Sequence, residues 1–320
     1  MSEAGETSTA EDAPAPVGFI GLGQMGTPMA ANLVRAGIAV KAFDSAESAC
    51  TRFAAETGVA AVASAAEACR EVAAVITMLP DSKVVRQVLC GSENGITAQG
   101  ALAAVAPQTI VIDMSSSSPI DTLRLGESLR NASGAPRVAL ADAPVSGGVK
   151  RAIDGSLAIM VGGEKAVVAR ILPLLEIMGG KVFATGKLGS GHAMKALNNY
   201  VSAAGLVAAC EAILVGRRFG LDPEVVVDVL NASTGRNNST EVKMKQQVLS
   251  GAFGSGFALS LMAKDLHTAA DIARHLGVAA PLSEVCEAMW AQADKALGAG
   301  ADHTEIYRYL EALHGSEEEE

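Results

Sequence analysis

The chain has 320 residues, enough for two domains, and a hydrophobic content of 49% that is sufficient for globular cores. Its net charge of −10 and aromatic content of 3% argue against a nucleic-acid partner, because nucleic-acid binders use basic surfaces and aromatic stacking. The 5 cysteines are scattered and form no CxxC pair. We therefore expect free thiols in a reducing compartment, the cytoplasm, and no metal site.

Both ends of the chain are acidic. Residues 1–15 lack the apolar run of a signal peptide and the arginines of a transit peptide, so we expect a disordered tail. Residues 315–320 contain the run Glu317–Glu320, which we interpret as a solvated end. The most apolar later segment, Ala193–Val215, contains a lysine, two asparagines and a glutamate. It is therefore expected to be a buried helix and not a membrane span.

A glycine-rich turn follows the first apolar segment, Val17–Ile20, and precedes a helical pattern over Thr27–Arg35. The turn has the pattern G-x-G-x-x-G and consists of Gly21, Leu22, Gly23, Gln24, Met25 and Gly26. In a strand–turn–helix unit, the three glycines allow the tight turn, the approach of a pyrophosphate and close helix–strand packing, respectively. The helix N-terminus adds free N–H groups and a positive dipole end. We therefore predict a dinucleotide site; the alternative is a glycine-rich turn that binds no nucleotide.

An acidic residue ends the next apolar strand. Asp44 follows Val40–Phe43 and lies 21 residues beyond Gly23, close to the spacing of ~20 at which a carboxylate reaches the adenosine ribose. A carboxylate there accepts hydrogen bonds from the ribose hydroxyls and repels a 2′-phosphate. Residues 45–48 supply no arginine or lysine to bind that phosphate. NAD is therefore favoured as the cofactor, with NADP as the second candidate.

The alternation of apolar strands and helices continues through the first half. Strands are expected at Val75–Met78, Ile110–Ile112, Val138–Ala141, Leu157–Val161 and Val182–Ala184, and a helix at Lys165–Met178. This alternation indicates a parallel sheet covered on both faces, a Rossmann-type doubly wound fold. Ligands of such sheets bind beyond the carboxyl ends of the strands. Leu79, Pro80 and Ser116 follow two of these ends, where Asp81 can cap a helix and a serine can also be an ordinary turn residue.

Two later segments offer polar groups to a small substrate. Ser146, Gly147 and Gly148 follow a strand, and their backbone N–H groups form a concavity that suits a carboxylate, unless this is an ordinary loop. In the stretch Gly189–Tyr200, Lys195 and Asn199 are four residues apart and lie on one face of a helix. Their ammonium and amide groups can converge on one molecule. The alternative for an isolated lysine is a surface side chain that extends along apolar neighbours.

From Gly191 onwards the strand pattern is absent. A long helix is expected up to Gly220, and Asp222 and Pro223 begin the next helix. Later helical patterns cover Glu241–Leu249, Leu259–Leu276, Pro281–Leu297 and Thr304–Leu313. We expect a division near Leu188 into a dinucleotide-binding domain, 16–188, and an all-α domain for substrate binding and oligomerisation, 189–314. Arg236 or Asn238, in the polar linker 233–240, either sets specificity or is simply solvated.

Five segments in this order resemble the β-hydroxyacid dehydrogenase family, which includes 3-hydroxyisobutyrate dehydrogenase and tartronate semialdehyde reductase. They are GFIGLGQMGTPMAANL, the MLP of Met78–Pro80, DAPVSGG (Asp142–Gly148), GSGHAMKALNN (Gly189–Asn199) and Lys264-Asp265-Leu266. Together they extend over nearly the whole chain between the acidic ends. The 6-phosphogluconate dehydrogenases share the early motifs but have a much larger helical half, for which this chain has no room.

The resemblance implies a role for each site residue. The loop Gly21–Gly26 would hold the dinucleotide together with Leu79, Pro80, Val84 and Ser116, and Lys264 would reach towards it. Ser146, Gly147 and Gly148 would bind the substrate carboxylate, Asn199 would orient the substrate, and Lys195 would be the catalytic residue. The resemblance also implies a homodimer or homotetramer.

The implied activity is hydride transfer between NAD(P) and a short-chain 3-hydroxy acid, similar to 3-hydroxyisobutyrate, or its semialdehyde. Lys195 would act as the general acid/base. One alternative is a reductase of tartronate semialdehyde, a sulfonated aldehyde or an imine on the same scaffold. An alternative of another class is a protein that senses NAD(H) without turnover, which would not need Lys195 or Asn199.

Overall fold

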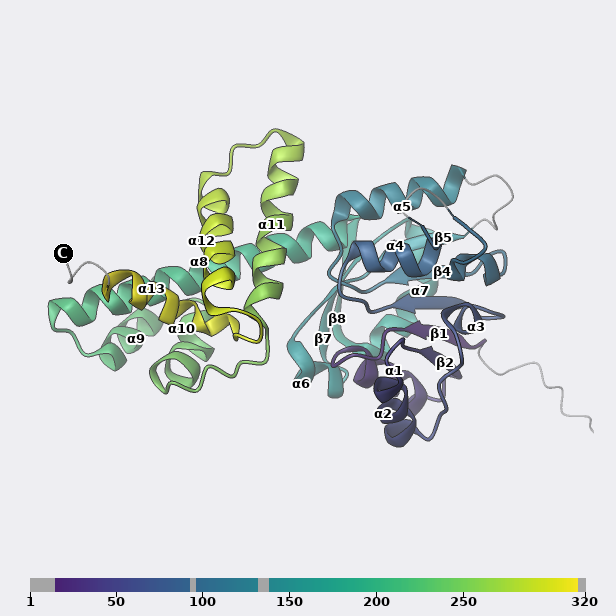
Figure 1. Ribbon diagram of the computed structural model, residues 1–320, viewed down its shortest axis with the longest axis horizontal. Coiled ribbons are helices and arrows are strands. Elements are labelled where there is room, and N and C mark those ends of the chain that lie inside the picture. Colours follow the sequence, from purple (N-terminus) through teal and green to yellow (C-terminus); the bar gives the residue numbers. More distant parts are fainter. Residues whose placement is uncertain (1–14, 93–95, 132–137, 316–320) are drawn as a thin grey trace, which may run out of the picture. The chain divides into compact units, whose positions relative to one another are not determined.

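The computed structural model describes residues 15–92, 96–131 and 138–315 and divides into two compact units (Figure 1). The first unit comprises Met1–Ser117 and Asp121–Gly191, and the second comprises Ser118–Ile120 and His192–Glu320. The first is a mixed α/β unit and the second is helical, as the sequence predicts. The two expected acidic tails lie outside the described residues, except for Ala15 and Gly315.

The first unit is built on one sheet of eight strands. The strands are β1 (Val17–Ile20), β2 (Val40–Phe43), β3 (Ala74–Thr77), β4 (Ile110–Asp113), β5 (Ala139–Asp142), β6 (Val145–Ser146), β7 (Leu157–Gly162) and β8 (Gly179–Gly186). Their order is β2-β1-β3-β4-β5-β7-β6, and β8 pairs with β7. The pairs from β2 to β5 are parallel, as in a Rossmann-type sheet.

The sheet departs from the expected parallel arrangement at β7. This strand pairs antiparallel with both β5 and β6, and parallel with β8. A parallel connection needs a crossover of a dozen or more residues, usually a helix. Between β5 and β7 the chain instead forms the short strand β6 and a helix of 6 residues, α6 (Gly148–Ile153), and returns in the opposite direction. The sequence analysis did not anticipate β6, because two residues carry no periodicity.

Helices cover both faces of the sheet. They are α1 (Gly26–Arg35), α2 (Glu47–Thr57), α3 (Ala65–Ala68), α4 (Ser82–Cys90), η1 (Ala101–Ala104), α5 (Pro119–Asn131), α6 and α7 (Lys165–Met178). Ile76 of β3 packs in one apolar cluster with side chains of α1, α2 and α7, whereas its neighbour Val75 packs in another with α3, α4 and α5. Because both faces of the sheet bury side chains, the sequences of the central strands are almost continuously apolar.

The second unit is helical throughout its described part, apart from one isolated bridge between Ala258 and Asp302. Its elements are α8 (Ser190–Phe219), α9 (Pro223–Ala232), α10 (Asn238–Val242), the π-helix η2 (Met244–Leu249), α11 (Leu259–Leu276), α12 (Pro281–Leu297), the 3₁₀-helix η3 (His303–Glu305) and α13 (Ile306–Gly315). Among the described residues, α8 alone is long and apolar enough to cross a membrane, but 50% of its most apolar window is buried, as in the core helix of a soluble protein.

Two predicted N-terminal helix caps are present in the structure, and one predicted helix is interrupted. Asp81 accepts a hydrogen bond from Val84 N, and Asp222 caps α9 with Pro223 in the first turn, as expected. The prediction of a single helix over Glu241–Leu249 is wrong, because the structure has two helical segments there. Lys243, with φ −123°, separates α10 from the π-helix, because its half-buried side chain turns towards Ser202 of α8.

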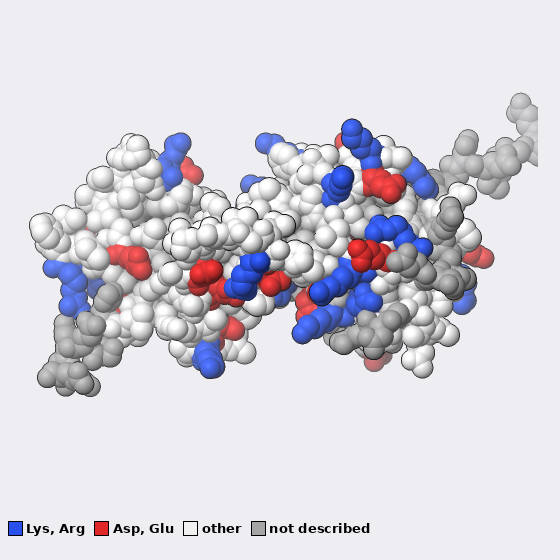
Figure 2. All heavy atoms as spheres, turned by 90° about the horizontal axis from the view of Figure 1, so that it is seen from above, with Lys and Arg blue, Asp and Glu red and all other residues white. Residues whose placement is uncertain are grey.

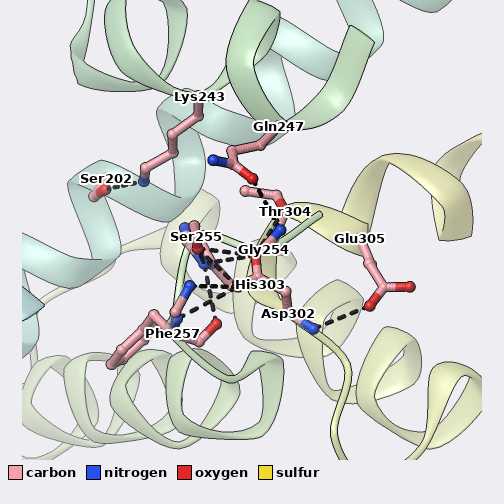
Figure 3. A network of polar contacts seen from close by, with 11 residues as sticks. Ser202, Lys243, Gln247, Gly254, Ser255, Phe257, Asp302, His303, Thr304 and Glu305 are labelled. Atoms are coloured by element: carbon pink, nitrogen blue, oxygen red, sulfur yellow. Dashed lines mark hydrogen bonds and ion pairs between the residues drawn. The ribbon is translucent and has the colours of Figure 1, made fainter. Parts of the chain in front are cut away.

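A hydrogen-bond network fastens the loop before α11 (Figure 3). The Asp302 carboxylate accepts hydrogen bonds from the hydroxyl groups of Ser255 and Thr304 and from the backbone N–H groups of Gly256, Phe257 and Thr304. Burial alone would raise the pKa of the Asp302 carboxyl. The bonds from His303, Thr304 and Ser255 outweigh burial and hold this pKa well below its ordinary value. The carboxylate therefore stabilises the folded second unit.

We expect Asp302→Asn to lower the free energy of unfolding of the second unit by about 2–4 kcal/mol, because hydrogen bonds to a charged group are lost. The carboxylate contributes fully above the ordinary aspartate pKa of ~3.9, and its contribution is lost as the pH falls below that value through the depressed folded-state pKa. The difference between wild type and variant should therefore shrink as the pH is lowered from 7 to 3.

Urea unfolding followed by the fluorescence of Trp290 measures this difference, since the single tryptophan is fully buried in the second unit. Asp271→Asn is the matched control, because this carboxylate of α11 accepts no hydrogen bond within the described part of the chain. If Asp302→Asn and wild type have the same unfolding midpoint at pH 7, the Asp302 carboxylate does not stabilise the second unit.

Candidate active site

The glycine loop lies between β1 and α1 and contains two kinds of glycine. Gly21 has φ 104°, and a side chain there would collide with the Met78 carbonyl; at Gly26 it would collide with the Gly21 carbonyl. Gly23 is exposed, and a Cβ atom added there would meet nothing within 4 Å. Protein packing therefore explains Gly21 and Gly26 but leaves open space at Gly23. That space fits the approach of a pyrophosphate to the backbone.

Asp44 holds this loop from the carboxyl end of β2. Its Oδ2 accepts a hydrogen bond from Leu22 N at 2.7 Å, and its Oδ1 accepts one from Ala46 N at 2.8 Å. Each carboxylate oxygen keeps a second acceptor position. The carboxylate can thus order the loop and still accept hydrogen bonds from ribose hydroxyls.

Arg52 of α2 is a cation beside this loop that the sequence analysis missed. Its Nη2 donates to the carbonyl oxygen of Leu22 at 2.8 Å. Arg52 lies one to two helical turns beyond residues 45–48, the segment directly after Asp44 that contains no basic residue. The signal that could have found it is the helical spacing, which returns a side chain of α2 towards the start of that helix.

The other cofactor candidates of the first unit follow neighbouring strands. Leu79 comes after β3, and its backbone N–H donates to Ser115 Oγ at 2.9 Å. Ser116 lies in the loop after β4, and Val84 lies in the first turn of α4. Because β1, β3 and β4 are parallel neighbours, their carboxyl ends lie at one edge of the sheet. The structure therefore brings these residues and Pro80 to the same edge as the glycine loop.

The Ser-Gly-Gly segment forms an open backbone loop. Ser146 belongs to β6, and Gly147 and Gly148 are exposed, with φ 137° and 68°. A side chain at Gly148 would meet nothing within 4 Å, so glycine is required there by its left-handed backbone and not by crowding. The loop offers backbone N–H groups to an anion.

Four polar side chains meet in the second unit. Asn199 Nδ2 of α8 donates to Asp265 Oδ2 of α11 at 2.6 Å, and Lys264 Nζ lies 3.7 Å from Asp265 Oδ1. Lys195 lies one turn before Asn199 and is 8% exposed, while Asn199 and Asp265 are 6% and 4% exposed. Asp265 is a second candidate that the sequence analysis missed, although it lies in the Lys-Asp-Leu segment. Its bond fixes the Asn199 amide and leaves one Nδ2 hydrogen for a ligand.

The surroundings of Lys195 lower the pKa of its side chain. Burial is the largest effect and lowers the pKa of the Lys195 ammonium; the Asp265 carboxylate raises it, and the Lys264 ammonium lowers it. The resulting pKa lies below the ordinary lysine value. A lysine with such a pKa can exchange a proton with a substrate hydroxyl nearer to neutral pH than a free lysine can.

Comparison with known proteins assigns the chain to a family. A profile described as the NAD binding domain of 6-phosphogluconate dehydrogenase matches residues 16–186, and one described as NAD-binding of NADP-dependent 3-hydroxyisobutyrate dehydrogenase matches residues 189–310. The chain is 34% identical to 2-(hydroxymethyl)glutarate dehydrogenase of Eubacterium barkeri over 93% of this chain and 96% of that protein. It is 38% identical to the probable 3-hydroxyisobutyrate dehydrogenase of Mycobacterium tuberculosis over 91% and 94%.

The chain belongs to the β-hydroxyacid dehydrogenase family. A solved structure of Mycobacterium tuberculosis 3-hydroxyisobutyrate dehydrogenase with L-serine has a TM-score of 0.82 and 35% identity, and the match covers 93% of this chain and 99% of that one. This β-hydroxyacid dehydrogenase is an NAD(P)-linked oxidoreductase of small hydroxy acids or their semialdehydes. The family and the cofactor class that the sequence indicates are thus confirmed.

Proposed function

We propose that the protein is a cytoplasmic dehydrogenase that oxidises a short-chain 3-hydroxy acid to its semialdehyde reversibly and prefers NAD to NADP. The observation that carries the proposal is the buried group of Lys195, Asn199 and Asp265, in which a lysine of lowered pKa lies one turn from an oriented amide. Relatives named for 3-hydroxyisobutyrate, L-serine and 2-(hydroxymethyl)glutarate support the class of substrate.

In this proposal the bound dinucleotide supplies the two-electron redox chemistry. Lys195 accepts the hydroxyl proton during oxidation and returns a proton to the carbonyl oxygen during reduction. The free Nδ2 hydrogen of Asn199 orients the substrate oxygen, while Asp265 holds the amide in place. The backbone N–H groups of the loop at Ser146–Gly148 bind the carboxylate. Lys264 and the loop Gly21–Gly26, with Leu79, Pro80, Val84 and Ser116, bind the cofactor.

Two observations separate this function from its alternatives. A protein that only senses NAD(H) has no use for a buried lysine beside an oriented amide, and burying a lysine costs free energy that binding the cofactor alone gives no reason to incur. Solved imine reductases resemble the chain at 14–19% identity, which shows a common fold alone. The intact Ser-Gly-Gly loop and Lys195 favour a hydroxy acid with a carboxylate.

The first prediction concerns substrate and cofactor. The purified protein should oxidise at least one of 3-hydroxyisobutyrate, glycerate, serine, 3-hydroxypropionate and threonate, with a higher kcat/KM for NAD than for NADP, because Asp44 repels a 2′-phosphate. Steady-state rates with both cofactors at saturating substrate measure the ratio. A tenfold preference for NADP would contradict the cofactor proposal, and binding of NAD without turnover of any of these acids would favour a sensor.

The second prediction concerns proton transfer. Lys195→Ala should lower kcat ~10²–10⁴-fold, the usual contribution of a positioned proton-transfer group. For oxidation, wild-type kcat/KM should fall as the pH drops through a pKa below ~10.4, because the lysine must be neutral to accept a proton. That limb of the pH profile should vanish in Lys195→Ala.

Asp265→Asn provides an independent check on this assignment. It removes a carboxylate that raises the pKa of Lys195, so the limb should move to lower pH. Lys195→Arg is the matched control of similar size, and it should not restore oxidation, because guanidinium stays protonated. A Lys195→Ala protein that keeps most of its kcat and the wild-type pH profile would show that the proton acceptor lies elsewhere.

An exposed apolar stripe on α8 supports a homo-oligomer, either a dimer or a tetramer. Its members recur every three, four or seven residues and are Met194, Leu197, Val201, Ala208, Ala212, Val215 and Phe219. Val201 is 67% exposed and Phe219 is 83% exposed. Figure 2 shows that uncharged residues dominate one face of the second unit. A stripe of this periodicity along the whole helix suits a facing helix of a second copy.

The third prediction follows from this stripe. Val201→Glu combined with Val215→Glu should convert the oligomer to a smaller species, because each charge would be buried without a partner in the interface. Sedimentation equilibrium measures the mass. Leu123→Glu is the matched control, since it places the same charge on an exposed apolar position of α5 in the first unit. A wild-type protein that sediments as a monomer would exclude the oligomer.

A further inference from the structure

Arg52 and Asp44 both bind the backbone of Leu22, one at its carbonyl oxygen and the other at its N–H group. Asp44 Oδ2 accepts from the Leu22 N–H, and Arg52 Nη2 donates to the Leu22 carbonyl. Because both bonds end on one residue, the guanidinium and the carboxylate lie within roughly 9 Å of each other. The edge of the loop where an adenosine ribose is expected thus carries a cation and an anion.

The charge of Arg52 is not neutralised by the protein. Within the part of the chain that the structure describes, Arg52 forms no ion pair, and its hydrogen-bond partner is an uncharged carbonyl. That carbonyl also accepts a hydrogen bond from Thr27 Oγ at 2.7 Å, so it does not need Arg52 to be satisfied. The guanidinium is exposed and keeps four further N–H donors. It is therefore free to bind an anion at little cost to the fold.

We propose that Arg52 determines cofactor choice together with Asp44, by binding the 2′-phosphate of NADP whose approach Asp44 opposes. The inference rests on the proposed dinucleotide function and adds to it a residue outside the segment 45–48. A guanidinium presents paired N–H donors that match two phosphate oxygens. Asp44 repels the same phosphate and accepts from the hydroxyls of NAD. Cofactor preference is then the difference between two contacts of opposite sign near Leu22, and not the result of Asp44 alone.

The test measures dissociation constants by titration calorimetry of the full chain with NAD⁺ and NADP⁺, so that no substrate is needed. Asp44→Ser should tighten NADP⁺ binding about tenfold or more, since it removes the repulsion and leaves Arg52 in place. Arg52→Gln should weaken NADP⁺ binding about tenfold more than NAD⁺ binding, because a charge-assisted contact to phosphate is lost. In the double variant the gain from Asp44→Ser should disappear, while Arg52→Lys in the same background should retain part of it.

Lys41→Gln is the matched control. Lys41 is also a cation that donates to a backbone carbonyl, that of Arg70, but it lies on β2 beside Gly18, before the glycine loop begins. Its replacement should leave the NAD⁺/NADP⁺ ratio unchanged. If Arg52→Gln weakens the binding of NAD⁺ and NADP⁺ equally, the inference is overturned. Arg52 would then contact a part of the molecule that both dinucleotides share. A gain in Asp44→Ser that persists without Arg52 would also overturn it. Failure of wild type to bind either dinucleotide would instead refute the proposed function.

Discussion

The buried carboxylate of Asp142 links the segment that leads into the Ser-Gly-Gly loop to the segment that leads into α8. It lies at the end of β5, just before the Ser-Gly-Gly loop, and its Oδ1 accepts a hydrogen bond from Gly189 N, one residue before α8. A Cβ atom at Gly162 would lie 2.6 Å from this Oδ1, and one at Gly191 would lie 2.9 Å from Oδ2. The absence of side chains at Gly162 and Gly191 therefore leaves space for the Asp142 carboxylate. Through its bond to Gly189 N, this carboxylate fixes the position at which α8 begins.

The position of Lys195 on that helix creates an electrostatic balance. Complete burial would suppress its charge, and Asp265 restores part of the preference for the ammonium form. Asp265 simultaneously binds Asn199, so a single carboxylate acts on both the lysine and the amide to which we assign roles in catalysis. A substitution at Asp265 therefore changes the surroundings of both side chains at once, and the pH profile of the rate separates the effect on Lys195 from the effect on Asn199 better than the rate alone.

Much of the fold could be predicted from sequence because its elements carry strong periodic patterns. The bounds of α7, α11 and α12 agree with the expected ranges to the residue. The predictions from sequence failed where tertiary contacts override the local hydrophobic pattern. The break at Lys243 results from a side chain that reaches another helix, and the reversal of β7 depends on strand pairing that no short segment encodes. In the site, spacing identified Lys195 and Asn199, but Asp265 and Arg52 required three-dimensional contacts from other helices.

The network around Asp302 has a consequence for the order of folding during synthesis. The strands and the buried Asp142 contact of the first unit lie before residue 192, so this unit can fold while the ribosome is still translating the second. The loop Ser255–Phe257, in contrast, forms hydrogen bonds with Asp302 and His303, which are made 45–48 residues later. Until then the loop before α11 lacks these hydrogen bonds, although Asp265 of α11 can already bind Asn199 of α8. The nascent chain can therefore bring a completed nucleotide-binding unit out of the ribosomal tunnel well before the network around Asp302 in the second unit can form.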